Sequence, residues 1–304
     1  MLGGWRRWRR GEVRWQATPA WTQAVSADWP DWLLEAPVTD RFHAKQGRST
    51  GRWVVRSHPP LVVYLKRHYR LPLGQRLCAL LWPGLGVSPA RQEARGLRLA
   101  QGLGLPVPET VLAAEWIGPG LKLQSALAIA ELTGQWAVNE ALPQARDRWP
   151  PQAVQQWKKQ VGLEIARLTA LLHRAGWFHQ DLYLCHFYVA LPLEGAPLPT
   201  VGPGAVTLID WQRLVRRRWL PWAAQVKDLA QLLYSSWTEG VTAADRLRWW
   251  RAYCVGMGIT LGSRYERLLT WAVRFKAERY RRHNRQAKAS PWPEPASGRL
   301  RRSA

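Results

Sequence analysis

The spacing of hydrophobic and polar positions changes near residue 134 of this 304-residue chain. Upstream, short apolar runs bounded by turn residues predict strands at 40–45, 53–56, 61–65, 110–117 and 121–130. Downstream, apolar residues recur every three or four positions, and the longest such series predicts an amphipathic helix carrying Val154, Trp157, Val161, Ile165, Leu168 and Leu172. We therefore expect an α+β fold with two lobes, a small β-rich lobe followed by a larger, mainly helical lobe.

The predicted elements divide the chain into two lobes and two ends. Residues 38–133 form the expected N-lobe and its connector, and residues 134–281 form the expected C-lobe. One main helix interrupts the N-lobe strands over residues 88–99. Ser88 is placed to cap this helix, and Pro89 occupies its first turn, where proline is tolerated.

The two ends differ from the lobes in composition. Residues 1–37 alternate Trp with Arg and Pro without a clear period, which predicts a loosely ordered arm. Residues 282–304 are basic and contain Pro and Ser, which predicts a disordered tail. Trp and Arg together suit a membrane interface, because the indole lies at headgroup depth and the guanidinium binds phosphate. A basic tail without a dedicated partner would have the same composition, and both interpretations stay open.

The charge of the chain indicates anionic partners. The formal net charge is +23 and the sequence pI is near 11.1, so nucleic acid, anionic lipid and acidic glycan all remain candidates. The 3 cysteines form no C-x-x-C pair, which predicts a reducing compartment and no zinc site. No secretory signal is visible, and the longest apolar stretch, 77–87, is shorter than the ~20 residues that cross a bilayer. We expect a cytoplasmic protein, peripheral to a membrane.

Two aspartates lie at the ends of strand-like segments of the C-lobe. Asp181 lies in a His-x-Asp turn within the stretch 176–189, and Asp210 ends the apolar run 206–209. Such a pair suits phosphoryl transfer, because one carboxylate can accept the proton of an attacking hydroxyl while the other holds Mg²⁺ on nucleotide phosphates. His186, five positions after Asp181, could bind the divalent ion or the phosphates.

Two N-lobe residues could complete a phosphate site. Lys66 ends the strand 61–65, and Glu93 lies one turn into the helix 88–99. In kinase-type folds, a helical glutamate pairs with a strand lysine and aligns it on the phosphates. We therefore expect an ion pair between Lys66 and Glu93.

The rest of a nucleotide site would come mainly from backbone. Gly47, Ser49 and Gly51 lie in a glycine-flanked turn, and a hairpin there could cover phosphates with its N–H groups. Glu131 and Thr133 lie in the connector between the lobes, where the backbone would meet the adenine edge. Two glycines in a turn are common, so an ordinary hairpin explains the first segment equally well.

Each candidate by itself has an ordinary structural explanation. A lysine that leaves a strand is usually solvated, a glutamate on a helix usually only adds charge, and aspartates after strands occur in many proteins. The specific signal is the set in its order along the chain: Lys66, Glu93, Asp181, His186 and Asp210.

Several segments resemble the bacterial lipopolysaccharide kinase family, the Kdo/WaaP-type sugar kinases. In chain order and over roughly residues 38–240 they are VVYLKRHY, EARGLRLAQGLGLPVPETVLA, SALAIAELTG, HQDLYLCHFYV and LIDWQRL. The resemblance implies a protein-kinase-like fold and transfer of the ATP γ-phosphate to a hydroxyl of an inner-core heptose or Kdo at the cytoplasmic membrane face. The implied partners are a lipid-linked core oligosaccharide or another anionic glycolipid and an anionic membrane surface, with no specific nucleic acid.

The same resemblance implies a role for each candidate. Asp181 would be the catalytic base, and Asp210 and His186 would face Mg²⁺. Lys66 would bind the phosphates of ATP, and Glu93 would hold Lys66.

The chain departs from the family at two positions of the motifs. Gln180 stands where an arginine is usual, and Trp211 stands where a smaller apolar residue is more common. By analogy with kinase-like folds, Asp228 should cap the backbone of the catalytic loop, and His179 should brace that loop. The basic run 216–218 lies near the place where an acceptor would dock, although a solvated charge run is its default interpretation.

Other classes of function compete with this interpretation. The Arg/Trp mixture suits a nucleic-acid-binding module, but no helix-turn-helix, RRM or zinc pattern is present. A protein kinase or a small-molecule phosphotransferase would share the site, yet no Asp-Phe-Gly or Ala-Pro-Glu segment is present. A non-catalytic kinase-like protein is the remaining alternative.

Overall fold

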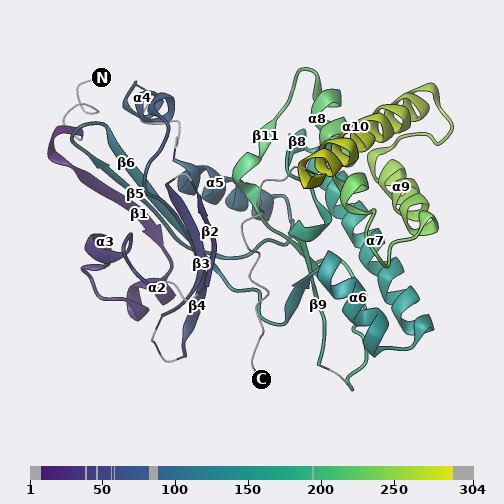
Figure 1. Cartoon of the computed structure of the whole chain (residues 1–304), viewed down its shortest axis with the longest axis horizontal. Coiled ribbons are helices and arrows are strands. Elements are labelled where there is room, and N and C mark those ends of the chain that lie inside the picture. The colour runs from purple at the N-terminus through teal and green to yellow at the C-terminus, as the bar shows by residue number, and fades with distance from the viewer. Residues whose placement is uncertain are drawn as a thin grey trace.

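An antiparallel sheet forms the N-lobe of the protein (Figure 1). The structure is a computed structural model that describes residues 8–37, 40–45, 47–55, 57, 59–81, 88–193 and 195–289. In this part of the chain the sheet has six strands, in the order β1 (Glu12–Ala17), β5 (Thr110–Gly118), β6 (Lys122–Ala130), β4 (Leu61–His68), β3 (Arg48–Val55) and β2 (Asp40–Lys45). All neighbours pair antiparallel. The strands expected near 40–45, 61–65, 110–117 and 121–130 are confirmed.

The glycine-flanked turn is shorter than the sequence predicted. β3 begins at Arg48, so Ser49 and Gly51 lie in the strand and only Gly47 belongs to the turn. Gly47 has a φ of +75°, the left-handed conformation that glycine adopts without strain. Local composition predicted a loop here, but β3 pairs with β4 along its whole length, and this non-local pairing decides the conformation.

The N-terminal segment is the clearest correction to the expected domain organisation. Instead of a loosely ordered arm, residues 12–17 form the edge strand β1, which pairs with β5. Two short helices follow, α2 (Pro19–Ala24) and α3 (Trp29–Trp32). Trp21 and Trp29 are 0% and 3% exposed and pack on an apolar face of the sheet. The N-lobe therefore extends over this segment.

The main N-lobe helix is α5 (Pro89–Gly102), which packs against β5 and β6. Its predicted start is confirmed, since the Ser88 hydroxyl accepts a hydrogen bond from the backbone N–H of Arg91 at 3.3 Å. A second helix, α4 (Leu73–Leu81), precedes it.

The C-lobe is mainly helical, as expected. Its helices are α6 (Val138–Arg148), α7 (Pro151–Arg174), α8 (Pro221–Ser235), α9 (Ala243–Met257) and α10 (Arg264–Ala289). Short strands lie between them: β7 (Gln135–Ala137), β9 (Phe187–Ala190) and β10 (Val206–Leu208) form one sheet, and β8 (Trp177–Phe178) and β11 (Val215–Arg216) form another. The fold is thus the predicted α+β arrangement of two lobes, a β-rich N-lobe and a mainly helical C-lobe.

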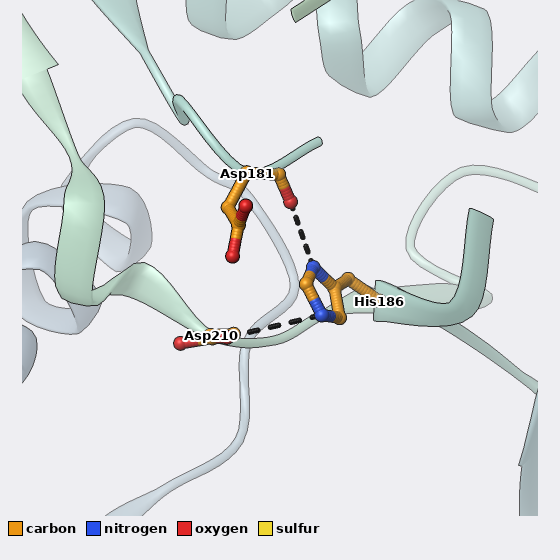
Figure 2. A group of neighbouring side chains, drawn as sticks. All are labelled: Asp181, His186 and Asp210. Carbon is orange, nitrogen blue, oxygen red and sulfur yellow. Dashed lines mark hydrogen bonds and ion pairs between the residues drawn. The ribbon is translucent and has the colours of Figure 1, made fainter. Parts of the chain in front are cut away.

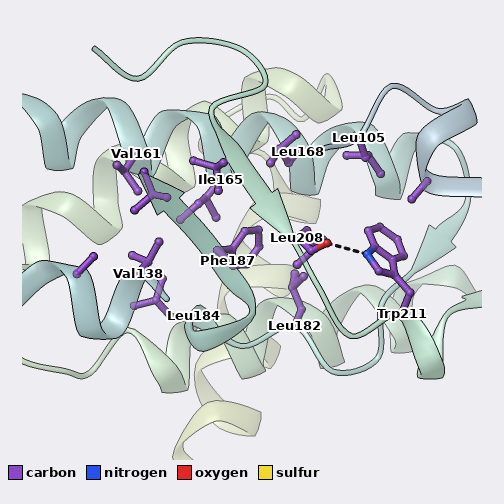
Figure 3. Packing of buried hydrophobic residues seen from close by; sticks show 14 of the residues in the cluster. Leu105, Val138, Val161, Ile165, Leu168, Leu182, Leu184, Phe187, Leu208 and Trp211 are labelled. Atoms are coloured by element: carbon purple, nitrogen blue, oxygen red, sulfur yellow. Dashed lines mark hydrogen bonds between the residues drawn. The ribbon is translucent and has the colours of Figure 1, made fainter. Parts of the chain in front are cut away.

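The C-lobe core places the loops that carry the candidate aspartates. Apolar side chains of α7, such as Ile165 and Leu168, pack with Leu182 and Phe187 on one loop and Leu208 on the other (Figure 3). Each such buried side chain contributes about 1.5–3 kcal/mol through removal from water. The loops on either side of β9 and β10 are therefore held against a rigid helix.

Two findings concern the rest of the C-lobe. Helix α10 continues to Ala289, so the residues 282–289 expected in a disordered tail are helical, and the remainder of that tail lies outside the described residues. Among the residues that the structure describes, none of the helices has both the length and the apolar character needed to cross a bilayer.

Candidate active site

Asp181, His186 and Asp210 come together at the mouth of the C-lobe core. Each offers a ligand atom, and these atoms lie within 4.8 Å of one another (Figure 2). Asp181 and His186 belong to the loop between β8 and β9, whereas Asp210 follows β10. The two aspartates, which are distant in the sequence, therefore share one site.

Strand pairing explains how two separate loops meet. β9 and β10 pair antiparallel, with Phe187 opposite Leu208. The next hydrogen bond continues the ladder, since the Ile209 N–H donates to the His186 carbonyl at 3.0 Å. Asp210 then adopts a φ of +64°, a left-handed conformation that aspartate tolerates better than most residues. This turn directs its side chain back toward His186.

His186 lies between the backbone of Asp181 and the carboxylate of Asp210. Its Nδ1 lies 2.7 Å from the Asp181 carbonyl oxygen, which can only accept, so Nδ1 carries the proton. Its Nε2 faces Asp210 Oδ2 at 3.8 Å. Burial lowers the pKa of His186, but the hydrogen bond and charge of Cys185 and the charge of Asp210 outweigh it and raise that pKa to about 9.

The predicted ion pair of the N-lobe reaches the same site. Lys66 Nζ lies 2.6 Å from Glu93 Oε1 and 3.9 Å from Asp210 Oδ1. Burial by itself lowers the pKa of Lys66, yet the charges of Glu93 and Asp210 outweigh it and leave that pKa above its usual value. The amine is therefore cationic and lies beside a carboxylate from the other lobe.

The contact between the lobes depends on a glycine that the sequence reasoning missed. A Cβ at Gly96 of α5 would lie 2.9 Å from the carbonyl oxygen and 3.0 Å from the Cβ of Trp211. Only glycine lets α5 approach the turn after Asp210 so closely. Trp211 is fully buried, and its indole N–H donates to the Leu208 carbonyl at 2.8 Å (Figure 3). A lone glycine inside a helical pattern was the signal that could have found this contact.

Asp228 holds the loop that carries Asp181, as predicted. Its carboxylate accepts the backbone N–H groups of His179 and Gln180, each at 2.7 Å. His173 Nε2 lies 3.2 Å from the same carboxylate. His179 braces the loop from the other side, because its Nε2 donates to the Ile209 carbonyl at 3.0 Å. Burial lowers the pKa of His179.

Gln180, which stands where the family usually has an arginine, and the nearby Arg213 both contribute to the loop of Asp181. The Gln180 amide donates to the Ala224 carbonyl at 3.2 Å and so ties the loop to α8. A positive charge still lies beside Asp181, because Arg213 NH1 is 3.5 Å from its carboxylate. Sequence reasoning missed Arg213, although it follows Asp210 by only three positions.

The remaining predicted residues lie in the N-lobe or at the connector. Ser49 is buried, and its hydroxyl bonds Tyr69 at 2.8 Å and Arg67 at 3.1 Å. Glu131 forms an ion pair with Arg52 at 2.7 Å, and its backbone N–H donates to Val62. These side chains are thus engaged within the N-lobe. Gly47 and Gly51 lie on the hairpin beside β4, and Thr133 lies in the turn after the connector. Nucleotide binding by these five residues stays a prediction.

The donor set fits a divalent ion of the Mg²⁺ type. Among the described residues, Asp210 Oδ1 is buried and accepts no hydrogen bond. A buried carboxylate oxygen without a hydrogen bond is costly unless a cation neutralises it, and the Lys66 amine lies 3.9 Å from this oxygen, beyond hydrogen-bond distance. Carboxylate oxygens are the protein ligands that Mg²⁺ prefers, and Lys66 beside them suits a phosphate group.

Similar proteins point to one family. A model of the lipopolysaccharide kinase (Kdo/WaaP) family matches residues 35–253. The lipopolysaccharide core heptose(I) kinase WaaP of Pseudomonas aeruginosa is 28% identical over 190 residues, which are 62% of this chain and 68% of that protein. The protein of the same name from Escherichia coli K12 is 29% identical over 157 residues, so the match spans 52% of this chain and about half, 53%, of that relative.

A solved structure supports the same conclusion. "WaaP in complex with acyl carrier protein" has a TM-score of 0.64 at 25% identity and covers 88% of this chain and 98% of that one. The predicted resemblance is confirmed. Since the family model spans both lobes, including Lys66, Glu93 and both aspartates of the site, the chain belongs to the lipopolysaccharide kinase (Kdo/WaaP) family.

Proposed function

We propose that this protein transfers the γ-phosphate of ATP, with Mg²⁺, to a hydroxyl of an inner-core sugar of lipopolysaccharide. The observation that carries the proposal is the convergence of Asp181, His186 and Asp210 within 4.8 Å, with Lys66 3.9 Å from Asp210. The similar WaaP proteins are heptose(I) kinases, which favours heptose over Kdo as the acceptor.

The proposed chemistry assigns one task to each residue. Asp181 accepts the proton of the attacking sugar hydroxyl, and Arg213 at 3.5 Å orients its carboxylate. Lys66 binds the phosphates of the nucleotide, and Glu93 holds Lys66 in place. Asp210 would hold Mg²⁺ through its carboxylate, and His186 would do so through Nε2 after that atom loses its proton; the ion when bound neutralises charge on the transferred phosphate.

The nucleotide would lie between the lobes. The hairpin with Gly47, Ser49 and Gly51 would cover the phosphates through its backbone. The backbone of Glu131 and Thr133 would meet the adenine edge, and the ion pair between Glu131 and Arg52 would keep that connector in place.

The proposed acceptor is a lipid-linked core oligosaccharide, or another anionic glycolipid, at the cytoplasmic face of the inner membrane. A net charge of +23 favours an anionic membrane surface as the place of action. We therefore propose a cytoplasmic protein that is peripheral to this membrane.

Phosphate transfer to lipid-linked core oligosaccharide tests the proposal. Asp181→Asn should reduce turnover by about 10²–10⁴-fold, the usual contribution of a general base. Asp147→Asn removes an exposed carboxylate of α6 and serves as the control. Full turnover by the Asp181→Asn protein would contradict the assignment of the base. Transfer to protein or to small alcohols alone would favour the alternative acceptors.

Nucleotide binding can be measured without an acceptor. ATP with Mg²⁺ should raise the melting temperature of the unaltered protein. Asp210→Ala should remove the part of this increase that depends on Mg²⁺. An unchanged Mg²⁺-dependent shift in this variant would contradict metal binding by Asp210. No shift in the unaltered protein would favour a non-catalytic kinase-like protein.

A carrier protein is a second proposed partner. The similar solved structure is a complex of WaaP with acyl carrier protein. In this chain a cavity of about 600 Å³ lies in the C-lobe, where apolar side chains of the five helices α6–α10 meet Leu184 of the loop that carries Asp181. An acyl chain is an apolar ligand suited to such a cavity.

Filling the cavity tests this partner. Gly162 of α7 lines the cavity, and a Cβ there meets nothing within 4 Å. Gly162→Phe should abolish acyl-dependent binding of acyl carrier protein, whereas Gly162→Ala should preserve it. Calorimetric titration with acylated and non-acylated carrier compares the two, and equal binding by both variants would contradict an acyl site in this cavity.

A further inference from the structure

The loop between β11 and α8 is exposed along its whole length. Trp219 and Leu220 are 87% and 84% exposed, and Trp222 at the start of α8 is 36% exposed. The three arginines before them, residues 216–218, are exposed as well. Three guanidinium groups and several large apolar side chains are thus exposed to solvent on one short segment. We call this segment the arginine-tryptophan loop (residues 216–222).

The charged residues of the segment that contains this loop have a single sign. Residues 211–227 contain Arg213, Arg216, Arg217, Arg218 and Lys227 and no carboxylate. Arg216 lies over the Trp177 ring at 5.6 Å. In the part of the chain that the structure describes, neither Arg217 nor Arg218 has a side-chain ion pair or hydrogen bond. Two guanidinium groups therefore remain available to an external anion.

Leu220 adds an unusual backbone conformation. It caps α8 with φ +53° and ψ 50°, a left-handed geometry that is unfavourable for leucine. Its side chain has almost no contact with the protein that would compensate for this cost. Strained residues with exposed apolar side chains concentrate where a partner is bound.

The loop is attached firmly to the catalytic elements. β11 pairs with β8, which leads directly into the loop that carries Asp181. The Arg217 N–H donates to the Gly176 carbonyl at 3.1 Å, and Arg213 contacts Asp181. In Figure 1 the loop rises above β11 and α8 at the edge of the C-lobe. A surface that the loop contacts would therefore lie close to the candidate active site.

We propose that the arginine-tryptophan loop docks the protein on an anionic lipid bilayer. Trp219 and Leu220 enter the interface at headgroup depth, and Arg217 and Arg218 bind lipid phosphates. Only the identity of the acceptor rests on the proposed function: docking would bring Asp181 to the surface where a lipid-linked hydroxyl lies. Binding to the bilayer itself requires neither ATP nor phosphate transfer.

A second exposed apolar face fits a bilayer less well. Trp271 and Phe275 of α10 stack at 5.7 Å and are 61% and 56% exposed. Helix α10 mixes both signs of charge, with Glu266 and Glu278 among its arginines. Its face is therefore the natural comparison for the loop in an experiment.

Co-sedimentation with vesicles tests the proposal on the full chain. Vesicles of phosphatidylcholine alone are compared with vesicles that also contain phosphatidylglycerol. Each arginine at an anionic surface is worth about fivefold in affinity, so removing Arg217 and Arg218 should weaken binding to the anionic vesicles about 25-fold. Because Arg217→Glu with Arg218→Glu also adds repulsion, the loss should be at least that large. Trp219→Ala with Leu220→Ala should weaken binding at high salt, where charge contributes least.

Controls separate docking from net charge and from unfolding. Arg148→Glu changes an exposed arginine of α6 and should alter vesicle affinity far less than a change in the loop. Leu193→Ala, at an 85% exposed leucine, is the control for Leu220. In the unaltered protein, anionic vesicles should protect the bonds after Arg217 and Arg218 from trypsin, a measurement that needs no variant.

The proposal would be overturned if both loop variants bound anionic vesicles as well as the unaltered protein does, or if Arg148→Glu reduced vesicle affinity equally. It would also be overturned if vesicles gave no protection from trypsin, or if Trp271→Ala reduced vesicle affinity and the loop variants did not. The proposal would also be overturned if the loop variants lost binding to acyl carrier protein but retained binding to vesicles, because the loop would then dock a protein. The Asp181→Asn protein should bind vesicles normally, so failure of phosphate transfer and failure of docking are distinguishable.

Discussion

Two regions of this protein are rich in tryptophan, but their indoles differ in exposure. In the N-terminal segment, residues 12–36, Trp21 and Trp29 are 0% and 3% exposed. In the arginine-tryptophan loop, Trp219 is 87% exposed. The two regions differ in charge, because residues 12–36 contain one arginine, Arg14, and four carboxylates, whereas the loop contains three arginines and no carboxylate. Tryptophan content by itself therefore does not decide whether an indole lies in a core or at a surface.

The difference comes from what each region can pair with. The N-terminal segment reaches a free edge of the sheet, where β1 pairs with β5, and an apolar face that its indoles cover. Trp21 and Trp29 meet edge to face with centroids 5.7 Å apart, a favoured geometry for aromatic pairs. The loop, by contrast, leads from the two-stranded sheet of β11 and β8 into α8, and its Trp219 and Leu220 are almost fully exposed. The first region builds the N-lobe, and the second remains available to a partner.

The strongest test of this contrast is Trp21→Ala. Truncating a buried tryptophan leaves a cavity in the N-lobe and should reduce the free energy of unfolding by about 3–5 kcal/mol. Urea denaturation followed by circular dichroism measures the change. A loss below about 1 kcal/mol would mean that the segment does not pack on the sheet, and that the two regions are alike.

Arg67 provides a second test of how the segment is attached. It is 1% exposed, and its NH1 donates to the carbonyls of Leu33, Leu34 and Ala36 at 3.2, 3.1 and 2.6 Å. Arg67→Leu deprives these acceptors of a charged donor and should cost about 2–4 kcal/mol. The same substitution at exposed Arg70 is the control, and equal losses in the two urea transitions would contradict the attachment.

The close contact between α5 and Trp211 lies just before the exposed loop in the chain. Gly96→Ala would place a Cβ 2.9 Å from the Trp211 carbonyl, and overpacking of this kind costs about 1–3 kcal/mol. Gly102→Ala on the same helix meets nothing within 4 Å and should be neutral or stabilising. Urea denaturation and phosphate transfer should both distinguish the two variants. Equal behaviour would mean that the close approach is unimportant.

Trp15 should show an intermediate effect within the N-terminal segment. It is 48% exposed, and its ring meets Trp29 edge to face at 5.8 Å. Trp15→Ala loses one aromatic pair and part of a buried surface, so about 1 kcal/mol of stability should be lost. A loss as large as that of Trp21→Ala would show that exposure does not rank the indoles of this segment.

Trp219 should show the smallest effect on stability. Because the side chain is almost fully exposed, Trp219→Ala should change the free energy of unfolding by less than about 0.5 kcal/mol. A loss comparable to that of Trp15→Ala would indicate that the indole packs on the protein in solution, which would remove the contrast between the regions.

Much of the site followed from local patterns. The turn around Asp181, the strand before Asp210 and the helix that carries Glu93 each had a recognisable signal in residue spacing, and their order along the chain indicated one site. Gly96 was missed because its importance lies in its close approach to Trp211, which is far away in the sequence. Arg213 was missed because only the turn after Asp210 brings it to Asp181. Ser49 was assigned to a turn, although pairing with β4 extends the strand over it.

The sequence by itself determined the α+β character, the main helices and strands, and the succession of charged groups, since these depend on the spacing of neighbours. Only the tertiary structure decided that the N-terminal segment belongs to the N-lobe and which indoles are exposed. The physical reason is that burial depends on the surface offered by distant strands and helices. A tryptophan in a segment of this kind is compatible with a core or with a membrane until that surface is known.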